Sequence, residues 1–366
     1  MKRSFLKILL MLSLFTCLCL ASSVSFASTK IDIPEYIRVK LNDGSIERIE
    51  LDTYLYSVVQ SEMGLYYKAS GMKSAERVPL EALKAQAVAS RSYAVYNILN
   101  ASHVADYDVT STTSSQVYKS NANIDSLVKK AVDETSGQVI TYDDEVACAY
   151  FFSTSGGYTE SSENVWYAAL PYLRGVEDEY EIEVDNNSFW TARYTVAEIE
   201  GKFPEIGNLK NVKIVEKSEN GRVIELKISG SDASKILLKN GIRTSLGASK
   251  LKSQWFKVEL DDDEIIFTGK GYGHGVGMSQ NGAIGMALEG FTYDEILEWY
   301  YTDIEIYGFS GTTKRGNSST KNDDKKNQNT DDESEEKEEE IVIEEEKPML
   351  EKLTAFCTTN WMLKML

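Results

Sequence analysis

The sequence predicts an α+β fold for one mixed domain, which we place at residues 28–309. Strand-like and helix-like segments are interspersed without the regular strand-helix-strand period of a parallel α/β sheet. Hydrophobic residues make up 42% of the 366-residue chain. That length and content suffice for the core of one large domain or two smaller ones. The fold class therefore follows from the order of the elements and from the amount of apolar sequence.

Residues 1–27 are typical of an export signal. Lys2 and Arg3 precede an apolar run from Phe5 to Val24, and the segment ends in Ser25-Phe26-Ala27, a small-x-small processing pattern. The run fits a cleaved signal peptide, and it is also long enough for an uncleaved N-terminal anchor. In both cases we expect the rest of the chain outside the cytoplasmic membrane, with membrane contact only through this segment.

The C-terminal part has a different composition. Residues 316–348 hold thirteen Asp and Glu against five Lys, so they contribute −8 to the formal net charge of −18. We predict a disordered acidic linker at 310–348. Residues 349–366 are apolar again, but too short and interrupted to span a membrane, and their pattern predicts no role.

Charge and cysteine usage exclude several classes of protein. The pI near 4.7, without a basic stripe interleaved with aromatic residues, argues against nucleic-acid binding. An uncharged or weakly charged sugar polymer fits better. The four cysteines, Cys17, Cys19, Cys148 and Cys357, form no disulfide framework. The core must therefore be stabilised by burial.

The N-terminal half of the domain predicts a hairpin and two helices. Segments 36–41 and 46–51 alternate like strands around a turn at 43–45. Asp52-Thr53 resembles a helix cap, and the helix over 54–63 carries Glu62 in its last turn. Pro79 in a first-turn position and an alanine-rich apolar pattern predict a core-packed helix over 79–99.

The remaining elements are shorter. We expect a helix at 124–136, strands at 137–141 and 147–152, and a loop at 153–157. Further strands are predicted at 212–216, 223–228 and 265–268, and a helix that contains Ala283 and Met286 follows.

Glycine occupies every second position from Gly271 to Gly277. Such a backbone suits unusual turns or the close approach of a ligand, and a tight loop packed under a helix explains it equally well. A phosphate cradle is a poorer interpretation, because the glycine spacing matches no nucleotide-binding motif. His274 within the loop is either a hydrogen-bonding site residue or a histidine that satisfies backbone carbonyls. His103 is expected to be solvated.

Four carboxylates are candidates for acid chemistry. Glu81 stands in the first turn of a helix, three residues before Lys84, which is a sufficient structural explanation. Glu160 and Glu163 follow a Gly-Gly turn and could cap or pair there. Glu62 ends an apolar segment, where partial desolvation would raise its pKa and keep a proton available for a leaving oxygen. An exposed Glu at the end of an apolar helix is the alternative.

Together these motifs resemble the SpoIID family, the sporulation stage II protein D and its amidase-enhancer relatives. The resemblance covers roughly residues 35–307. It lies in four blocks, which are Leu55–Met63 with its Ser-Glu-Met, Glu81–Tyr93, Tyr150–Trp166 with its Ser-Thr-Ser-Gly-Gly, and Gly269–Ala283. It implies a lytic transglycosylase that cleaves the bond between N-acetylmuramic acid and N-acetylglucosamine in peptidoglycan and leaves a 1,6-anhydro end.

In that family the glutamate of the Glu-Met pair is the catalytic acid, which falls on Glu62. The expected cleft is formed by the long helix and two loops. Its predicted substrate-binding residues are Lys84, Gln86, Arg91, Ser153, Ser155, Gly156, Gly157, Tyr272, His274, Gly275, Met278, Ser279 and Gln280. Lys84 and Arg91 share one helix face because they are seven residues apart, and a solvated stripe is the alternative for them.

The sequence departs from the family in two places. Many relatives have a proline just after the Glu-Met pair and a short connector, whereas this chain has Gly64 and a longer loop to Pro79. Some relatives bind zinc through a Cys and His cluster before a Gln-Val-Tyr. Here residues 110–115 before Gln116 contain only hydroxyl side chains, so we predict no metal and no cofactor.

Two other functions remain open at this stage. One is a non-catalytic protein that binds glycan strands and enhances a partner cell-wall amidase. The other is an ordinary muramidase hydrolase, which would need a second carboxylate at a defined distance from Glu62. Glu160 and Glu163 are the candidates for that place. The implied location is the cell wall or the outer face of the membrane, with a role in sporulation as one possibility.

Overall fold

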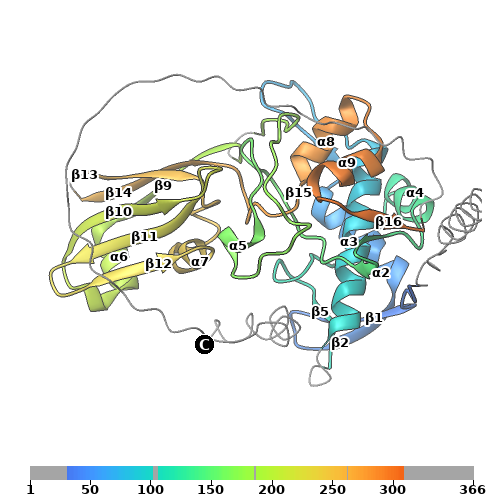
Figure 1. Ribbon diagram of the computed structural model, residues 1–366, viewed down its shortest axis with the longest axis horizontal. Coiled ribbons are helices and arrows are strands. Elements are labelled where there is room, and N and C mark those ends of the chain that lie inside the picture. Colours follow the sequence, from blue (N-terminus) through green and yellow to red (C-terminus); the bar gives the residue numbers. More distant parts are fainter. Residues whose placement is uncertain (1–30, 102–105, 185–186, 262, 309–366) are drawn as a thin grey trace, which may run out of the picture.

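The computed structural model describes residues 31–101, 106–184, 187–261 and 263–308. The predicted export signal, His103 and the acidic C-terminal segment lie outside these ranges. The described residues form both helices and sheets, which confirms the α+β class. Figure 1 shows two parts, a helical lobe and a lobe of strands, with the short helix α5 (Ser162–Val165) between them.

The helical lobe begins with the predicted hairpin. Strands β1 (Tyr36–Lys40) and β2 (Ile46–Glu50) pair antiparallel, and β5 (Val109–Thr110) joins β1 in parallel. Helix α2 (Leu51–Met63) starts directly after β2. The predicted cap at Asp52-Thr53 is therefore wrong. Glu50 is the N-cap residue, and the Thr53 hydroxyl donates to its carboxylate over 3.0 Å.

Helix α3 (Leu80–Asn100) is the predicted long helix, and it runs through the helical lobe (Figure 1). Its residues are buried on every side from Ala82 to Val95, apart from the half-buried Lys84. Alanines on one side belong to the apolar core shared with α2 and α4 (Ser126–Glu134). Ala85, Val88 and Ala89 belong to a second core with α8 (Gln280–Leu288) and α9 (Tyr293–Tyr300). A helix without a solvent face has no single apolar stripe.

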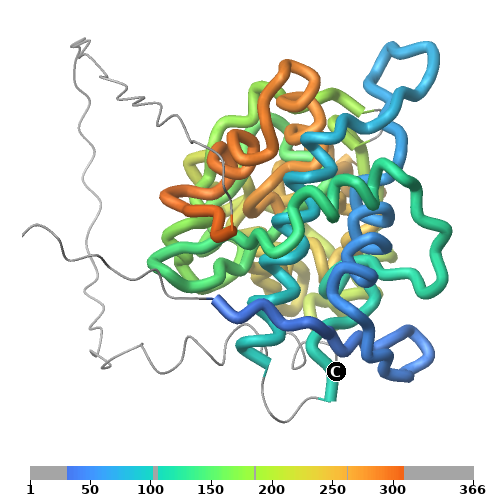
Figure 2. The backbone as a smooth tube through the Cα atoms, turned by 90° about the vertical axis from the view of Figure 1, so that its right-hand side faces the viewer, coloured from blue at the N-terminus to red at the C-terminus, as the bar shows by residue number. Residues whose placement is uncertain are grey.

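The second core is built from α8 (Gln280–Leu288), α9 (Tyr293–Tyr300) and the chain around residues 147–173. Strand β6 (Val139–Tyr142) pairs with β7 (Glu145–Val146) and with the C-terminal strand β16 (Glu305–Tyr307), which Figure 2 shows beside it. The predicted strand at 147–152 is wrong for residues 147–150. That apolar run reflects burial in the core, and only β8 (Phe151–Phe152) pairs, in parallel with β15 (Met278–Ser279).

The lobe of strands has its own apolar core. One of its sheets has the order β10-β11-β12 and the other β13-β14-β9, all antiparallel. The strands are β9 (Phe189–Thr195), β10 (Leu209–Lys217), β11 (Val223–Gly230), β12 (Ser234–Leu238), β13 (Phe256–Asp261) and β14 (Glu264–Lys270).

Short elements complete the described chain. They are β3 (Tyr66–Tyr67), β4 (Glu76–Arg77), α5 (Ser162–Val165), α6 (Val196–Lys202), η1 (Pro204–Ile206) and α7 (Gly241–Leu246). Strands β3 and β4 form a small hairpin in the long connector between α2 and α3. Among the described residues, no helix is long and apolar enough to cross a membrane.

Candidate functional site

Glu62 lies in the last turn of α2, as predicted, and its carboxyl group is held by neutral donors. The backbone N–H of Val117 donates to Oε1 over 2.6 Å, and the side chain of Gln280 is a second hydrogen-bond partner. Burial raises the pKa of Glu62 above its usual value, while these two donors, which stabilise the carboxylate, act in the opposite direction. The result is a carboxyl group that holds its proton to higher pH than an exposed glutamate does.

Gln280 is fixed by the long helix α3. Its Nε2 donates to Oε1 of Gln86 over 3.2 Å, and Nε2 of Gln86 donates to the Ser90 hydroxyl over 2.9 Å. Gln86 has no exposed surface and Gln280 is only 8% exposed. The predicted contact of Gln86 with substrate is therefore wrong. Gln86 supports Gln280, which in turn faces Glu62.

Aromatic rings pack beside the acid. Tyr54 of α2 stacks on Tyr118 with ring centroids 5.4 Å apart, and Nε2 of Gln116 contacts the Tyr54 hydroxyl at 3.4 Å. Gln116-Val-Tyr118 thus supplies both a ring and the backbone donor to Glu62. Val117 was not among the site residues predicted from sequence, because a backbone N–H leaves no signature in residue type. The Gln-Val-Tyr block occurs at the place where relatives also have it, and that position could have pointed to Val117.

Lys84 and Arg91 do share one face of α3, but that face packs against α4. Lys84 forms ion pairs with Glu81 at 2.9 Å and with Glu134 at 2.8 Å. The predicted structural role of Glu81 is confirmed, since its carboxylate also accepts the N–H of Tyr293 at the start of α9. Gln86 lies on a different face, toward α8, so the long helix points its polar side chains in two directions.

Arg91 was predicted to line the cleft, and this is wrong. The residue has no exposed surface. Its guanidinium donates to backbone carbonyls at the end of α4, with distances of 2.8 Å to Thr135 and 3.2 Å to Val132, and to the Gln138 carbonyl at 3.3 Å. A cation at a helix C-terminus is favoured by the unpaired carbonyls and by the helix dipole. Arg91 is thus a C-terminal cap for α4.

The glycine loop is packed against the protein's own chain. Gly277 has a φ of 77°, and a Cβ there would lie 2.0 Å from the Tyr150 carbonyl oxygen. At Gly275 a Cβ would lie 2.5 Å from Cζ of the buried Arg222. The alternation therefore reflects turns and close backbone packing, which was one of the two explanations. Gly275, Met278 and Ser279 of this loop were also predicted to contact substrate. All three are buried, so they offer little surface to a ligand.

Aromatic rings pack around His274, which is itself partly buried. Its Nδ1 accepts the N–H of Val276 over 3.1 Å, and Tyr150, Phe152 and Trp166 pack around it at centroid distances of 5.2–6.1 Å. Burial, and then the charges of Arg243 and Arg222, lower the pKa of His274 to about 3. The backbone of Phe151 is a further hydrogen-bond partner of the ring, so a histidine that satisfies a backbone carbonyl is the alternative that fits.

We therefore expect His274 to stay neutral throughout the physiological range. In a proton NMR titration its Hε1 resonance should not shift between pH 5 and 8, because the folded-state pKa lies far below that window. A midpoint between pH 6 and 7 would contradict this packing, and unfolded protein supplies the reference titration near the ordinary pKa of about 6.5.

The Ser153–Gly157 loop lies against the glycine loop. Thr154 and Tyr272 form an antiparallel bridge, and the Ser153 hydroxyl contacts that of Thr154 at 3.0 Å. Ser155 is fully buried, so its predicted contact with substrate is wrong. Gly156, Gly157 and Tyr272 are only partly buried, and they keep the surface that a ligand contact requires.

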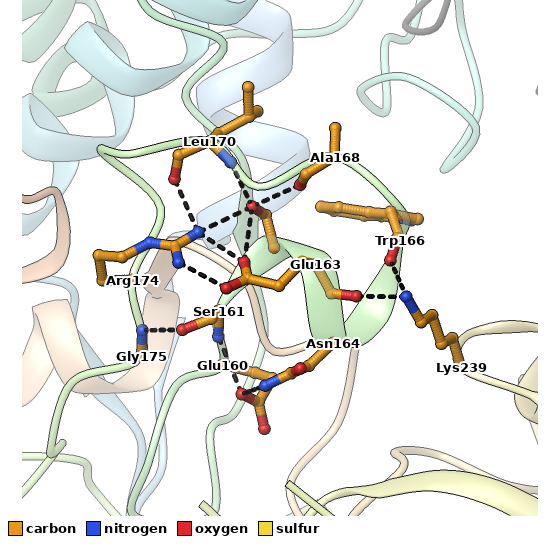
Figure 3. A network of polar contacts seen from close by, with 11 residues as sticks. Glu160, Ser161, Glu163, Asn164, Trp166, Ala168, Leu170, Arg174, Gly175 and Lys239 are labelled. Atoms are coloured by element: carbon orange, nitrogen blue, oxygen red, sulfur yellow. Dashed lines mark hydrogen bonds and ion pairs between the residues drawn. The ribbon is translucent and has the colours of Figure 1, made fainter. Parts of the chain in front are cut away.

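Glu160 and Glu163 are committed to other partners (Figure 3). The Glu160 side chain is fully buried and accepts the Ser161 N–H and the Asn164 amide at 2.9 and 2.8 Å. Glu163 forms a two-fold ion pair with Arg174, with both N···O distances 2.6 Å. Each therefore has the structural role that the sequence left open.

Metal ligands do not gather in this region. Across residues 31–101, 106–184, 187–261 and 263–308, no three His, Cys, Asp or Glu side chains form a group that could hold a metal ion. In the loop before Gln116, the hydroxyls of Thr110, Thr112 and Ser115 hydrogen-bond to one another, with distances of 3.2 and 3.3 Å from Thr110 Oγ1.

The fold and the site define an α+β protein with one desolvated carboxyl group held by neutral donors between three helices and a loop. Comparison with known proteins gives the family. The family model described as stage II sporulation protein, SpoIID, matches residues 42–142, and a domain of unknown function (DUF8618) matches residues 190–277.

Relatives extend this match over most of the chain. The chain is 34% identical over 295 residues to stage II sporulation protein D of Bacillus subtilis, which covers 76% of this chain and 80% of that protein. An uncharacterised protein of Brachyspira hyodysenteriae is 34% identical over 74% of this chain and 70% of its own length. The amidase enhancer of B. subtilis is 29% identical over 61% of this chain and 37% of its own length. The chain belongs to the SpoIID family.

Proposed function

We propose that this chain is an exported lytic transglycosylase that cleaves the bond between N-acetylmuramic acid and N-acetylglucosamine in peptidoglycan glycan strands. The observation that carries the proposal is the state of Glu62. Burial raises its pKa, and its two hydrogen-bond partners are neutral. A general acid at near-neutral pH needs such a proton-retaining carboxyl group.

The proposed reaction uses Glu62 twice. Its proton moves to the glycosidic oxygen as the bond from that oxygen to C1 of N-acetylmuramic acid breaks. The 6-hydroxyl oxygen of the same sugar then attacks C1, and the hydroxyl proton moves to the Glu62 carboxylate. The acid is regenerated, no water is consumed, and the product is a 1,6-anhydro end. The Val117 N–H and Gln280 stabilise the carboxylate between the two steps.

One carboxyl group is sufficient for this route, and the surroundings of Glu160 and Glu163 support it. Hydrolysis normally requires a second carboxylate that activates water. Glu160 is buried among its own hydrogen bonds and Glu163 is paired with Arg174. Neither is available to serve as that base without breaking these contacts, so ring closure is favoured over hydrolysis.

The alternative is a non-catalytic protein that binds glycan and enhances a cell-wall amidase. Similarity to the amidase enhancer of B. subtilis supports this second candidate, and similarity to stage II sporulation protein D supports a role in the cell wall during sporulation. Under either function, the chain acts in the wall or at the outer face of the membrane, and peptidoglycan strands and an amidase are its expected partners.

Incubation of the purified protein with glycan strands stripped of stem peptides tests the two functions. We expect 1,6-anhydro ends, identified by mass spectrometry. Reducing ends would instead indicate a hydrolase. Binding to strands without any release, together with stimulation of an added cell-wall amidase, would favour the enhancer.

A further inference from the structure

The protein contains a pair of acidic side chains that takes no part in the proposed reaction. Asp178 and Glu181 stand in the segment between α5 and β9. Asp178 is only 2% exposed. Glu181 accepts the backbone N–H groups of Ser155 and Gly156, the latter over 2.9 Å, and the hydroxyl of Ser279 over 3.0 Å. One carboxylate thus binds both loops that the sequence analysis singled out.

Ser279 connects this carboxylate to the start of α8. It is the N-cap residue of α8, and its Oγ accepts the N–H of Gly282 over 3.1 Å. A hydroxyl has one proton to donate, and here that proton is directed to Glu181. The lone pairs are then left for the helix cap. Gln280 is the next residue, so Glu181 fixes the backbone from which the Gln280 side chain extends toward Glu62.

The two carboxyl groups of the pair have different surroundings. The Tyr300 hydroxyl donates to Asp178 Oδ1 over 2.7 Å, while Oδ2 is buried without a hydrogen-bond partner. Burial, and then the adjacent Glu181, raise the pKa of Asp178 to about 7. Arg222 and Lys270 act on Glu181 as nearby positive charges. Asp178 therefore holds its proton to higher pH than an exposed aspartate does, while the Glu181 carboxylate accepts three hydrogen bonds.

We propose that Glu181 is a positioning residue, which holds the Ser155–Gly156 loop and the Ser279 cap together and so keeps the Gln280 amide against Glu62. It touches no reacting atom. Its significance for catalysis rests on the proposed function, but its effect on Glu62 does not. The consequence can therefore be measured on Glu62 itself, with or without turnover.

The direction of the change in the Glu62 pKa separates positioning from a direct electrostatic effect. Gln280 lowers the pKa of Glu62 by stabilising the carboxylate. If Glu181→Gln releases the Gln280 amide, the pKa of Glu62 rises. If Glu181 acted on Glu62 only as a nearby negative charge, its removal would lower that pKa. Glutamine has nearly the same size as glutamate, so the packing around position 181 is retained.

The experiment compares Glu181→Gln, Ser279→Ala and Gln280→Leu with Glu183→Gln as a matched control, because Glu183 is exposed and lies in the same segment. The pKa of Glu62 is followed by 13C NMR of carboxyl-labelled glutamate, with its signal assigned by its absence in Glu62→Gln. We expect the pKa to rise in all three variants and to stay unchanged in the control. Where turnover is measurable, kcat should fall about tenfold, the equivalent of one hydrogen bond.

Two outcomes would overturn the proposal. One is a rise in the Glu62 pKa for Gln280→Leu but an unchanged or lower pKa for Glu181→Gln in folded protein. The other is an unchanged Glu62 pKa for Gln280→Leu, since Gln280 would then have no effect on Glu62. Ser279→Ala keeps the Glu181 side chain and removes its link to α8, together with the hydroxyl cap on the Gly282 N–H, so it decides the case if Glu181→Gln fails to fold. Failure of the wild type to release anhydro ends would count against the proposed function alone.

Discussion

Glu62→Gln is expected to abolish release of 1,6-anhydro ends, with a loss of about 10²–10⁴-fold in turnover. The amide keeps the size of the side chain and can still accept the Val117 N–H, which donates to Oε1 over 2.6 Å in the wild type. It has no proton to give to the glycosidic oxygen. The rate of anhydro-end formation from peptide-stripped strands is the measurement, and strand binding by co-sedimentation should be retained.

The same variant should be at least as stable as the wild type at neutral pH. Because the pKa of Glu62 is raised on folding, its favourable contribution is present below the unfolded-state pKa and is lost as pH rises through the folded-state pKa. As pH rises through the folded-state pKa, the buried charge increasingly disfavours the fold, and glutamine removes that charge. Thermal unfolding at acidic and neutral pH checks this. Glu163→Gln is the matched control for turnover, and a comparable loss there would argue against a single-carboxyl mechanism.

Arg91→Met is expected to lower the free energy of unfolding by about 3–5 kcal/mol, measured by urea denaturation. The guanidinium is buried and donates to three backbone carbonyls around the end of α4. Methionine fills part of the space but removes the guanidinium donor from all three carbonyls and the ion pair with Asp52. The Val132 and Thr135 carbonyls then keep only the N–H groups of Thr135 and Gln138 and the Thr135 hydroxyl. The variant should therefore lose stability first and activity only as the fold is lost.

Lys84→Met on the same helix face is the control for this prediction. Its ion-pair partners Glu81 and Glu134 are partly solvated, so loss of the pairs should cost about 1 kcal/mol or less. If Arg91→Met proved as mild as Lys84→Met while it reduced turnover strongly, the substrate-binding role predicted from sequence would be restored.

The sequence was sufficient to predict the elements whose signals are local. The hairpin at Tyr36–Glu50, the long helix α3 and the position of Glu62 in the last turn of α2 all follow from alternation, turn residues and propensity. The strand predicted from the apolar run at 147–152 was wrong for residues 147–150, because burial in a core and pairing in a sheet require the same residue types.

Prediction of the site was limited by a different cause. Spacing correctly placed Lys84 and Arg91 on one face of α3, but it could not say which neighbour that face would meet. Gln86 appeared equivalent to them in sequence, yet it alone of the three points toward α8 and Gln280. Contacts such as Val117 to Glu62 join residues 55 positions apart through a backbone group, which no residue pattern records.

The packing of helix α3 also affects how a glycan strand would bind. Glu62, Gln86 and Gln280 stand on α2, α3 and α8, and the cores on both sides of α3 fix these helices against one another. The acid is thus held in place before any sugar arrives, and little reorganisation accompanies proton transfer. In the proposed reaction the polymer is the adaptable partner, since bending of the sugar ring is easier than displacement of a helix packed on all sides.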